Sequence, residues 1–422
     1  MADGSEGNAA PRQRVVIVGG SLGGLLAGNL LHRAGCDVTV HERIGTELAE
    51  RGVGIATHPE LHAAFERLGI TIDEAFGTRL EERITLGTDG QILARRRLPQ
   101  IQSTWGHLYR SLRGIFPAER YVAGATFTRA EAQGDRVLAH FADGSRIEAD
   151  LLIGADGVRS TVRAQLWPDA VPEYAGYVAW RGIVEEERLS AAHRDILFEH
   201  FIVCLPPGEH VVGYPVAGAD GDGSPGRRRF NIVWYRLTTA ERLREMQTDE
   251  SGHYHEAGIA PDLIVPSFVD EIRQAAENLL PPVLAEPMIR SRGLFFQTIV
   301  DLETPQMVEG SVALLGDAAF AARPHTGMGV VKATGDAVLL ADLIGAYPGE
   351  LAYALARYDA ERTRYGRSLV RFGRRLGTHV ETPGRSAGEI ELGDYLRRPE
   401  TVIQAISIPP PCSPLDVFRE DF

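Results

Sequence analysis

The segment Val15–Glu42 constrains the fold of this chain more than any other part of the sequence. It reads VVIVGGSLGGLLAGNLLHRAGCDVTVHE: a β-branched run, a glycine-rich turn, an apolar stretch of helical length, and a second β-branched run that ends in an acid. The run Val15–Val18 is short and continuously apolar, which is typical of a strand buried on both faces of a parallel sheet. The segment therefore predicts a strand–helix–strand unit of an α/β domain.

The turn in this unit has the spacing G-x-S-x-x-G from Gly19 to Gly24, and Ser21 takes the place of the second glycine. Gly19 permits the tight turn, and Gly24 lets the helix pack closely on the strand. The first N–H groups of the helix are free to bind a pyrophosphate. Glu42 lies about 20 residues downstream, where a carboxylate accepts hydrogen bonds from a ribose. The pattern predicts a dinucleotide site without specifying the dinucleotide, and the alternative is a unit that binds no nucleotide.

Composition excludes several classes of protein. The 422 residues suit about two domains. No run approaches the roughly 20 apolar residues that span a bilayer, and the polar start MADGSEGNAAPRQR lacks a signal-peptide core, so we expect a disordered leader over 1–11 and a cytoplasmic protein. The net charge of −13 argues against nucleic acid or an anionic membrane as partner. Cys36, Cys204 and Cys412 have no paired spacing, which excludes a zinc motif and a C-x-x-C redox pair, and we predict no metal site.

Turn and strand signals organise the rest of the chain. Arg51 lies in a glycine-rich loop that brings a cation and backbone toward a bound cofactor. The spacing of apolar residues predicts a helix over Trp105–Phe116. Asp143-Gly144 separates two alternating runs, which predicts a hairpin. Between Tyr174 and Pro287 several short strands alternate with Pro- and Gly-rich turns, which indicates an antiparallel sheet with a few helices.

Three predicted buried strands end in glycine and acid motifs. The first ends at the glycine-rich turn, the second at Asp156-Gly157, and the third at Gly316-Asp317. In an open α/β sheet, ligands lie outside the carboxyl ends of the strands. The three ends therefore converge on one long ligand. The alternative for each isolated Asp-Gly pair is a turn or a helix N-cap.

With these motifs the chain resembles the FAD-dependent aromatic hydroxylases of the p-hydroxybenzoate hydroxylase fold, the group A flavoprotein monooxygenases. The glycine-rich turn matches their first fingerprint, and Asp156-Gly-Val-Arg159-Ser160-Thr-Val-Arg163 matches their DG motif. Gly316-Asp317-Ala-Ala, with Pro324 and Gly327-x-Gly329, matches their GD motif. The resemblance covers about residues 12–375. Within the family the chain most resembles hydroxylases of pyridines and phenols such as 2,6-dihydroxypyridine 3-hydroxylase, from the segments YAGYVAWRG, HVVGYP and Arg323-Pro324-His325.

The resemblance implies a fold and a division into domains. The fold class is α/β, with a Rossmann-like FAD-binding domain, an interleaved antiparallel-sheet substrate domain and C-terminal helices. The FAD-binding domain takes 12–75, 104–170 and 290–345, and the substrate domain takes 76–103 and 171–289. Helices fill 346–380, and we expect an irregular tail over 381–422.

The resemblance also implies roles for the cofactor-binding residues. Glu42 binds the adenosine ribose, Arg43 and Arg110 reach the pyrophosphate region, and Asp317 binds the ribityl chain. Arg159 supports the flavin or the reductant. The complete expected set is Gly19, Ser21, Gly23, Gly24, Glu42, Arg43, Arg51, Arg110, Asp156, Arg159, Gly316, Asp317, Pro324, Gly327 and Gly329, with the last two glycines against the flavin ring.

The implied reaction is hydroxylation of an electron-rich aromatic or heteroaromatic ring. NADH or NADPH binds transiently and reduces FAD, and O₂ then forms a flavin C4a-hydroperoxide that attacks the ring. The implied partners are a small aromatic or natural-product substrate and O₂, and the implied assembly is a homodimer. Rival activities are a flavin-dependent epoxidase or another oxygenase acting on a larger natural product, and a nucleotide-binding protein of another class. The chain has no Trp-x-Trp-x-Ile-Pro motif of flavin halogenases.

Candidate catalytic residues follow from pattern. His210 and Tyr214 share one face of a predicted strand by the period of two, so both are candidates to face the substrate. The alternative is an exposed strand histidine and a packed tyrosine. His325 follows Pro324 near the expected flavin ring, where it either acts on substrate or holds its loop.

Overall fold

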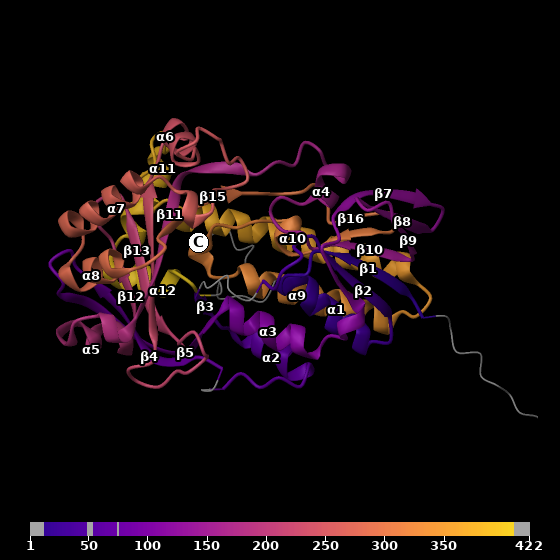
Figure 1. The fold of residues 1–422 in the computed structure, drawn as a ribbon, viewed down its shortest axis with the longest axis horizontal. Helices are drawn as coiled ribbons and strands as arrows, with labels where there is room; N and C mark the ends of the chain where they lie inside the picture. Colours follow the sequence, from indigo (N-terminus) through magenta and orange to yellow (C-terminus); the bar gives the residue numbers. More distant parts are fainter. Residues whose placement is uncertain (1–11, 49–53, 74–75, 409–422) are drawn as a thin grey trace, which may run out of the picture.

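The computed structural model describes residues 12–48, 54–73 and 76–408. It confirms the α/β fold class, with a mostly parallel Rossmann-like sheet at one end of the molecule and a larger, mostly antiparallel sheet at the other (Figure 1). Helices α9 (Gly329–Ala346) and α10 (Leu351–Gly377) run between the two ends. Among the described residues, no helix combines the length and apolar character needed to cross a bilayer.

The smaller sheet contains the strands whose ends carry the cofactor motifs. Its central strands pair in parallel, with Ile17 opposite Ile153 on one side and Val40 on the other. Ile17 is fully buried, as the continuous apolar run predicts. The strand order is β16 (Val308–Glu309), β17 (Val312–Leu314), β10 (Leu151–Gly154), β1 (Arg14–Val18), β2 (Asp37–Glu42) and β6 (Tyr121–Ala123), with β16 alone antiparallel to its neighbour.

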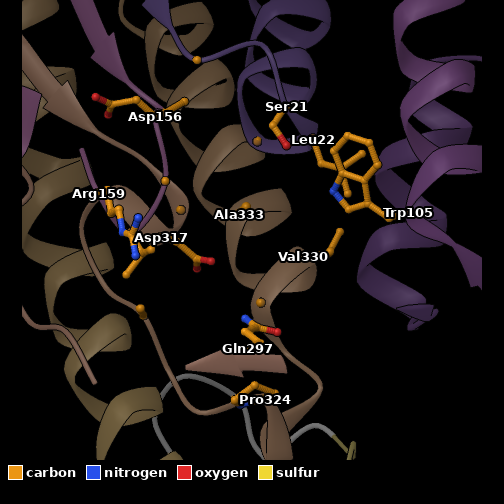
Figure 2. Close-up of a pocket in the computed structure, with 18 of the residues that line it drawn as sticks. Ser21, Leu22, Trp105, Asp156, Arg159, Gln297, Asp317, Pro324, Val330 and Ala333 are labelled. Carbon is orange, nitrogen blue, oxygen red and sulfur yellow. The ribbon is translucent and has the colours of Figure 1, made fainter. Parts of the chain in front are cut away.

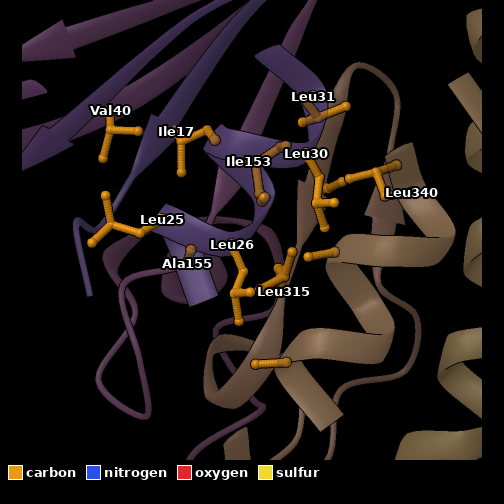
Figure 3. Close-up of a cluster of buried hydrophobic side chains, with 14 of the residues drawn as sticks. Ile17, Leu25, Leu26, Leu30, Leu31, Val40, Ile153, Ala155, Leu315 and Leu340 are labelled. Carbon is orange, nitrogen blue, oxygen red and sulfur yellow. The ribbon is translucent and has the colours of Figure 1, made fainter. Parts of the chain in front are cut away.

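A single apolar core fixes this sheet beneath the helices. Leu26 and Leu30 of α1 (Leu22–Arg33) pack toward Leu315 and toward Leu340 of α9 (Figure 3). Burying each such leucine contributes about 1.5–3 kcal/mol. This packing holds the N-termini of α1 and α9 at the same edge of the sheet, where the three motif-bearing strands end.

The larger sheet separates two environments. On one face, Trp180, Val211 and Trp234 pack with helices α5 (Ala191–Glu199), α7 (Pro266–Leu279) and α8 (Pro282–Arg290). Val212 and Tyr214 alternate with these residues and point to the other face. The strand order is β15 (Phe295–Asp301), β11 (Glu173–Glu185), β14 (Arg229–Leu237), β13 (His210–Val216), β12 (His200–Cys204), β4 (Thr78–Leu86), β5 (Ile92–Thr104) and β3 (Gly54–Ala56).

Two strands of this sheet come from segments that we assigned to the FAD-binding domain. β15 lies within 290–345 but pairs with β11, and β3 lies within 12–75 but pairs with β5. Both segments cross between the sheets, so a boundary drawn from motifs alone misplaces them.

A third, three-stranded sheet contains the predicted hairpin. β8 (Arg136–Phe141) pairs antiparallel with β9 (Arg146–Ala149), and Gly144 takes the left-handed φ of +87° in the turn between them. β7 (Phe127–Gln133) completes the sheet. The remaining helices are α2 (Pro59–Arg67), α3 (Trp105–Ile115), α4 (Thr161–Leu166) and α6 (Ala240–Met246).

The expectation of an irregular tail over 381–422 is wrong for its described part. Helices α11 (Ala387–Leu396) and α12 (Pro399–Ala405) form there. Ser386 and Glu389 make a capping box at the start of α11, and Pro399 is the first residue of α12. Apolar residues of α12 are buried against the larger sheet. The Pro- and Gly-rich composition of the tail concealed these helix-start signals.

Candidate active site

One cavity of approximately 710 Å³ lies between the smaller sheet and the larger sheet. Residues from all three cofactor motifs line it, together with side chains from β11, β13, β14 and β15. Figure 2 shows Ser21 and Trp105 on one part of its wall, with Asp156, Arg159 and Asp317 on another. The cavity is within the range of about 300–1,000 Å³ that is usual for ligand sites.

The glycine-rich turn has the close contacts that its glycines predict. A Cβ on Gly19 would lie 2.4 Å from the carbonyl oxygen of Ala155, and a Cβ on Gly24 would lie 1.9 Å from the carbonyl oxygen of Gly19. Ser21 is the N-cap of α1 but its hydroxyl makes no capping bond, and Ser21 and Gly23 line the cavity. The free N–H groups at the start of α1 are therefore available to an anion.

Glu42 lines the cavity and also fixes the turn. Its two carboxylate oxygens accept hydrogen bonds from the N–H of Gly20 at 2.8 Å and of Ile44 at 2.9 Å. A carboxylate has further acceptor capacity, so Glu42 can still accept a ribose hydroxyl. Arg43 follows it, exposed and at the cavity wall.

Two predicted arginines stand apart from this group. Arg51 lies outside the described residues. Arg110 is exposed on α3 and is not among the residues that line the cavity, so its contact with the pyrophosphate region stays a prediction. Trp105, in the first turn of α3, lines the cavity instead, stacked on Tyr109 with ring centres 5.1 Å apart. The sequence predicts a helix that begins at Trp105, but it does not reveal that the Trp105 side chain lines the cavity.

Asp156 has both roles that the sequence offers for the second motif, since it caps a helix and also lines the cavity. Its Oδ2 accepts hydrogen bonds from the N–H of Thr161 at 2.7 Å and of Val162 at 3.3 Å, so it caps α4. Its Oδ1 is buried with no hydrogen-bond partner, and the residue lines the cavity. Burial raises the pKa of this carboxyl, against the hydrogen bonds that lower it. Arg159 also lines the cavity and donates to the carbonyl of Glu256 at 3.0 Å.

The third motif rests on a buried charge network that the sequence reading missed. Gly316 has a left-handed φ of +64° and donates its N–H to Asp336 at 2.9 Å. Asp336 pairs with Arg362 at 2.5 Å. Lys332 is 2% exposed, and its Nζ lies 3.8 Å from both Asp317 and Asp336. The Asp317 side chain is half-exposed at the cavity wall. Lys332 is the sole lysine of the chain, which was the available signal.

The glycines around the far end of the cavity differ in the space beside their backbone. Gly327 takes a φ of +65°, and a Cβ there would lie 2.8 Å from Cα of Ser407. A Cβ on Gly329 or on Gly157 would meet no atom within 4 Å, although both residues line the cavity. Pro324 begins the short helix η5 (Pro324–Thr326) beside them. The backbone is therefore bare at Gly157 and Gly329, as close approach of a flat ring requires, whereas Ser407 covers Gly327.

These observations fit the FAD that the resemblance implies. One cavity contains two helix N-termini, a carboxylate at the end of β2 and a second carboxylate at Asp317, together with the unobstructed glycines Gly157 and Gly329. The donors suit a pyrophosphate, and the acids suit sugar and ribityl hydroxyls.

The opposite compartment of the cavity is polar and aromatic. Arg181 donates from Nε to the side chain of Gln297 at 3.1 Å, and both line the cavity with Tyr214 and Tyr235. Burial raises the pKa of each tyrosine, and the charge of Arg181 opposes this shift. Tyr214 stacks on Phe201 with ring centres 5.1 Å apart. Both tyrosines therefore stay protonated at neutral pH beside a fixed cation.

The structure separates the candidate catalytic residues. Tyr214 lines the cavity, as its strand face predicts. His210 is fully buried and does not line it, because His325 and Tyr235 cover its ring, with ring centres 5.6 and 5.3 Å away. The prediction that His210 faces the substrate is therefore corrected. His325 lines the cavity, and its Nε2 is 2.8 Å from the hydroxyl of Tyr177, while its Nδ1 is buried without a partner.

The C-terminal segment, which is the part of the described chain that follows α10, supplies wall residues that sequence reasoning did not find. Ile406 and Ser407 line the cavity. The buried Arg83 donates to the carbonyl of Ile406 at 2.6 Å and to that of Ser407 at 3.0 Å. Arg397 donates to four backbone carbonyls of neighbouring segments, those of Leu205, Pro206, Glu209 and His379.

Comparison with known proteins gives the same assignment. A family model described as "FAD binding domain" matches residues 12–72, and one described as "FAD binding domain-like" matches residues 174–301. The 2,6-dihydroxypyridine 3-monooxygenase of Paenarthrobacter nicotinovorans is 28% identical over 88% of this chain and 92% of its own length. The 3-amino-4-hydroxybenzoate 2-monooxygenase of Streptomyces cremeus is 30% identical over 88% of each chain.

Solved structures share the fold. The structure of 2,6-dihydroxypyridine-3-hydroxylase from Arthrobacter nicotinovorans superposes with a TM-score of 0.83 at 25% identity, covering 90% of this chain and 95% of that one. Klebsiella pneumoniae HpxO, complexed with FAD and uric acid, superposes with a TM-score of 0.72 at 24% identity, covering 93% and 97%. Since the three motifs meet in one cavity and the likeness to these enzymes extends over nearly the whole chain, the chain belongs to the group A flavoprotein monooxygenases, the family of FAD-dependent aromatic hydroxylases.

Proposed function

We propose that this FAD-dependent monooxygenase hydroxylates an electron-rich aromatic or heteroaromatic ring with an ionisable hydroxyl group, such as a phenol or a hydroxypyridine. The observation that carries the proposal is the position of Arg181, Tyr214 and Tyr235 in the same cavity as the three cofactor motifs. The names of the relatives support it, because they include monooxygenases of a dihydroxypyridine and of an aminohydroxybenzoate.

The proposed cofactor contacts follow the cavity from one end to the other. Glu42 would bind the adenosine ribose, the start of α1 and Arg43 the pyrophosphate, and Asp317 the ribityl chain. Pro324, Gly327 and Gly329 would contact the flavin ring. When bound, FAD supplies the hydride acceptor and the centre at which O₂ is activated. NADH or NADPH would be the reductant, and Arg159, exposed at the cavity wall, would contact it.

The chain itself would orient the substrate and control its charge. Arg181 would hold the hydroxyl oxygen of the ring as an anion, since a fixed cation lowers the pKa of a neighbouring acid. Tyr214 stays protonated because burial raises its pKa, so it would donate a hydrogen bond to that oxygen. A phenolate or hydroxypyridine anion is more electron-rich than its conjugate acid. This division of roles needs no buried histidine as base, in agreement with the covered position of His210.

Apolar residues complete the proposed substrate compartment. Val212, Val233, Ile299 and Ile406 line it and exclude water from the ring. An epoxidase for a large natural product would need a mostly apolar compartment, whereas Arg181 and Gln297 place a cation and an amide in this one. These two polar side chains within an otherwise apolar wall therefore favour a hydroxylated aromatic substrate.

The test is turnover under ¹⁸O₂. The purified holoenzyme would be given NADH or NADPH with hydroxypyridines, hydroxybenzoates and aminohydroxybenzoates, and products would be weighed by mass spectrometry. Gain of one ¹⁸O atom by a hydroxylated aromatic ring supports the proposal. Oxygen transfer to a bulky non-aromatic alkene alone would support the epoxidase alternative, and no transfer to any aromatic compound would reject the proposed substrate class. The proposed homodimer and cytoplasmic location are separate, tested by sedimentation and by fractionation.

A further inference from the structure

Three histidines from distant parts of the chain meet behind the cavity wall. His210 comes from β13, His325 from η5, and His379 from the segment directly after α10. None is more than 1% exposed. Their ring centres are 4.5 Å (His210–His379), 4.7 Å (His325–His379) and 5.6 Å (His210–His325) apart. We call these residues the histidine cluster.

The histidine cluster gathers buried nitrogens without hydrogen-bond partners. Both ring nitrogens of His210, Nδ1 of His325 and Nε2 of His379 have none among the described residues. A buried polar atom left unpaired costs about 1–3 kcal/mol. Several such atoms at one point indicate a missing partner rather than independent defects.

Neighbouring groups fix which nitrogen is available on two of the rings. Nδ1 of His379 bonds the carbonyl oxygen of Leu376. A carbonyl only accepts, so Nδ1 carries the hydrogen and Nε2 presents a lone pair. His325 bonds Tyr177 through Nε2, which leaves Nδ1 directed to the cluster. Metal-ligating histidines commonly have this arrangement, in which the second nitrogen bonds a carbonyl or hydroxyl group that orients the ring.

We propose that the histidine cluster binds one divalent transition-metal ion, and that Zn²⁺ is the ion that fits best. Three neutral imidazoles around a tetrahedral zinc with Zn–N of about 2.0–2.1 Å have ring centres about 5 Å apart, close to the spacing here. The candidate nitrogens all lie within 4.8 Å of one another. Small ring rotations would bring them to the roughly 3.4 Å of tetrahedral ligation. Water would take the fourth position.

Burial, and after it the neighbouring charges, keep the three rings neutral, which is the form in which imidazole binds a metal. Burial holds the pKa of His210 and of His325 well below the ordinary histidine value and lowers that of His379 to about 4. The facing cations are Arg323, which is paired with Asp301 at 2.9 Å, and Arg397, which donates to backbone carbonyls. The geometry, not these shifts, carries the assignment.

A metal here would have a structural effect. It would join β13, the loop that contains Pro324 and Gly327, and the start of the C-terminal segment at one point. Sequence spacing does not reveal such a site, because its ligands come from separate parts of the chain, and our sequence-based prediction of no metal site rested on spacing. The inference is independent of the proposed substrate.

The first test is metal content. Untagged protein would be stripped with a chelator, exposed to Zn²⁺, freed of excess ion and measured by inductively coupled plasma mass spectrometry. We expect one zinc per wild-type chain, loss of that zinc in His379→Ala and His210→Ala, and retention in His193→Ala, whose histidine pairs with Glu286 on a different part of the fold. Tyr177→Phe should weaken zinc binding by about 10–100-fold, since it removes an orienting partner. Equal zinc in wild type and His379→Ala would overturn the proposal.

The second test needs no variant, so it decides the question even if the substitutions prevent folding. Crystals of the wild-type protein grown with Zn²⁺ would be measured above and below the zinc absorption edge. An anomalous peak about 2.0–2.1 Å from the three histidine nitrogens supports the proposal. Density without anomalous signal would identify an ordered water molecule and overturn it.

Discussion

The backbone N–H of Ser407 donates a hydrogen bond to the carbonyl oxygen of His325 at 2.8 Å. This bond joins the C-terminal segment to the loop that contains Pro324 and Gly327. Ser407 has a φ of +50°, the one left-handed non-glycine residue within 12–48, 54–73 and 76–408. The C-terminal segment is therefore part of the active-site wall rather than an appendage.

Ile406→Ala should change substrate preference. The substitution removes wall volume beside Val212 and Tyr214, so we expect a several-fold higher KM for a small substrate and turnover of bulkier rings. The measurement is kcat/KM across substrates of graded size. Val402→Ala is the control, because Val402 is buried in α12 without lining the cavity. Both variants should lose stability, and an identical substrate range in both would contradict the assignment of the wall.

Asp317→Ala should weaken FAD binding. Loss of a hydrogen bond to a charged group costs about 1.5–3 kcal/mol, which corresponds to a roughly 10–100-fold higher Kd. Fluorescence titration of the stripped protein with FAD measures this. Asp342→Ala, on the exposed face of α9 where it pairs with Arg67, should leave the Kd unchanged. Full flavin occupancy of Asp317→Ala at nanomolar FAD would reject the ribityl contact.

Arg181→Met should reduce kcat/KM by about 10–100-fold for substrates that ionise, because it removes the cation proposed to hold their anion. The effect should diminish as pH rises above the pKa of the substrate in solution, where the anion forms without help. Arg181→Lys should recover part of the activity. A pH-independent loss in both variants would indicate that Arg181 only supports Gln297.

Asp336→Asn should destabilise the fold. It removes the charged partner of Arg362 and of Lys332, and breaking a buried ion pair on one side costs about 3–5 kcal/mol. Urea unfolding of the apoprotein measures the change. Substituting the exposed pair Arg67–Asp342 should cost under about 1 kcal/mol. A similar cost for the two pairs would show that the buried network is not structural.

Acid should destabilise the protein before its carboxylates protonate. Burial lowers the pKa of His41 and of His58 to about 4, below about 6.5 in an unfolded chain. Between these values the unfolded state binds more protons, so the free energy of unfolding is full above pH 6.5 and falls toward pH 4, by about 1.4 kcal/mol per pH unit for each histidine. His41→Gln should remove one such contribution from the slope between pH 6.5 and 4.5. An unchanged slope would contradict the neutral buried state of His41.

The local motifs of the fold could be read from the sequence because short-range sterics set them. Gly19 and Gly24 admit no side chain, and Asp143-Gly144 demands a turn. Long-range pairing could not be read in the same way. β15 directly precedes β16 and β17 of the smaller sheet along the chain, yet it pairs with β11 of the larger sheet, since packing and not its own residues chooses its partner.

The site was predictable where one strand or turn determines a position. The two-residue period of the strand correctly predicts that Tyr214 lines the cavity. His210 lies on the same face but does not line the cavity, because His325 and Tyr235, from other elements, cover it. Arg110 is exposed on α3 and does not line the cavity, and the sequence alone does not reveal which residues of that helix face the cavity. Lys332, Asp336 and Arg362 form a network only once α9 and α10 are side by side.

Because Lys332 is the sole lysine of the chain and is buried, its reactivity can measure how often the structure around it opens. A reagent that acylates amines finds a single lysine side chain besides the N-terminal amine, and that side chain is 2% exposed. Acylation of Lys332 in the native state must therefore wait for a fluctuation that separates α9 from its neighbours. Its rate measures the free energy of that opening at the cofactor site, without any engineered probe.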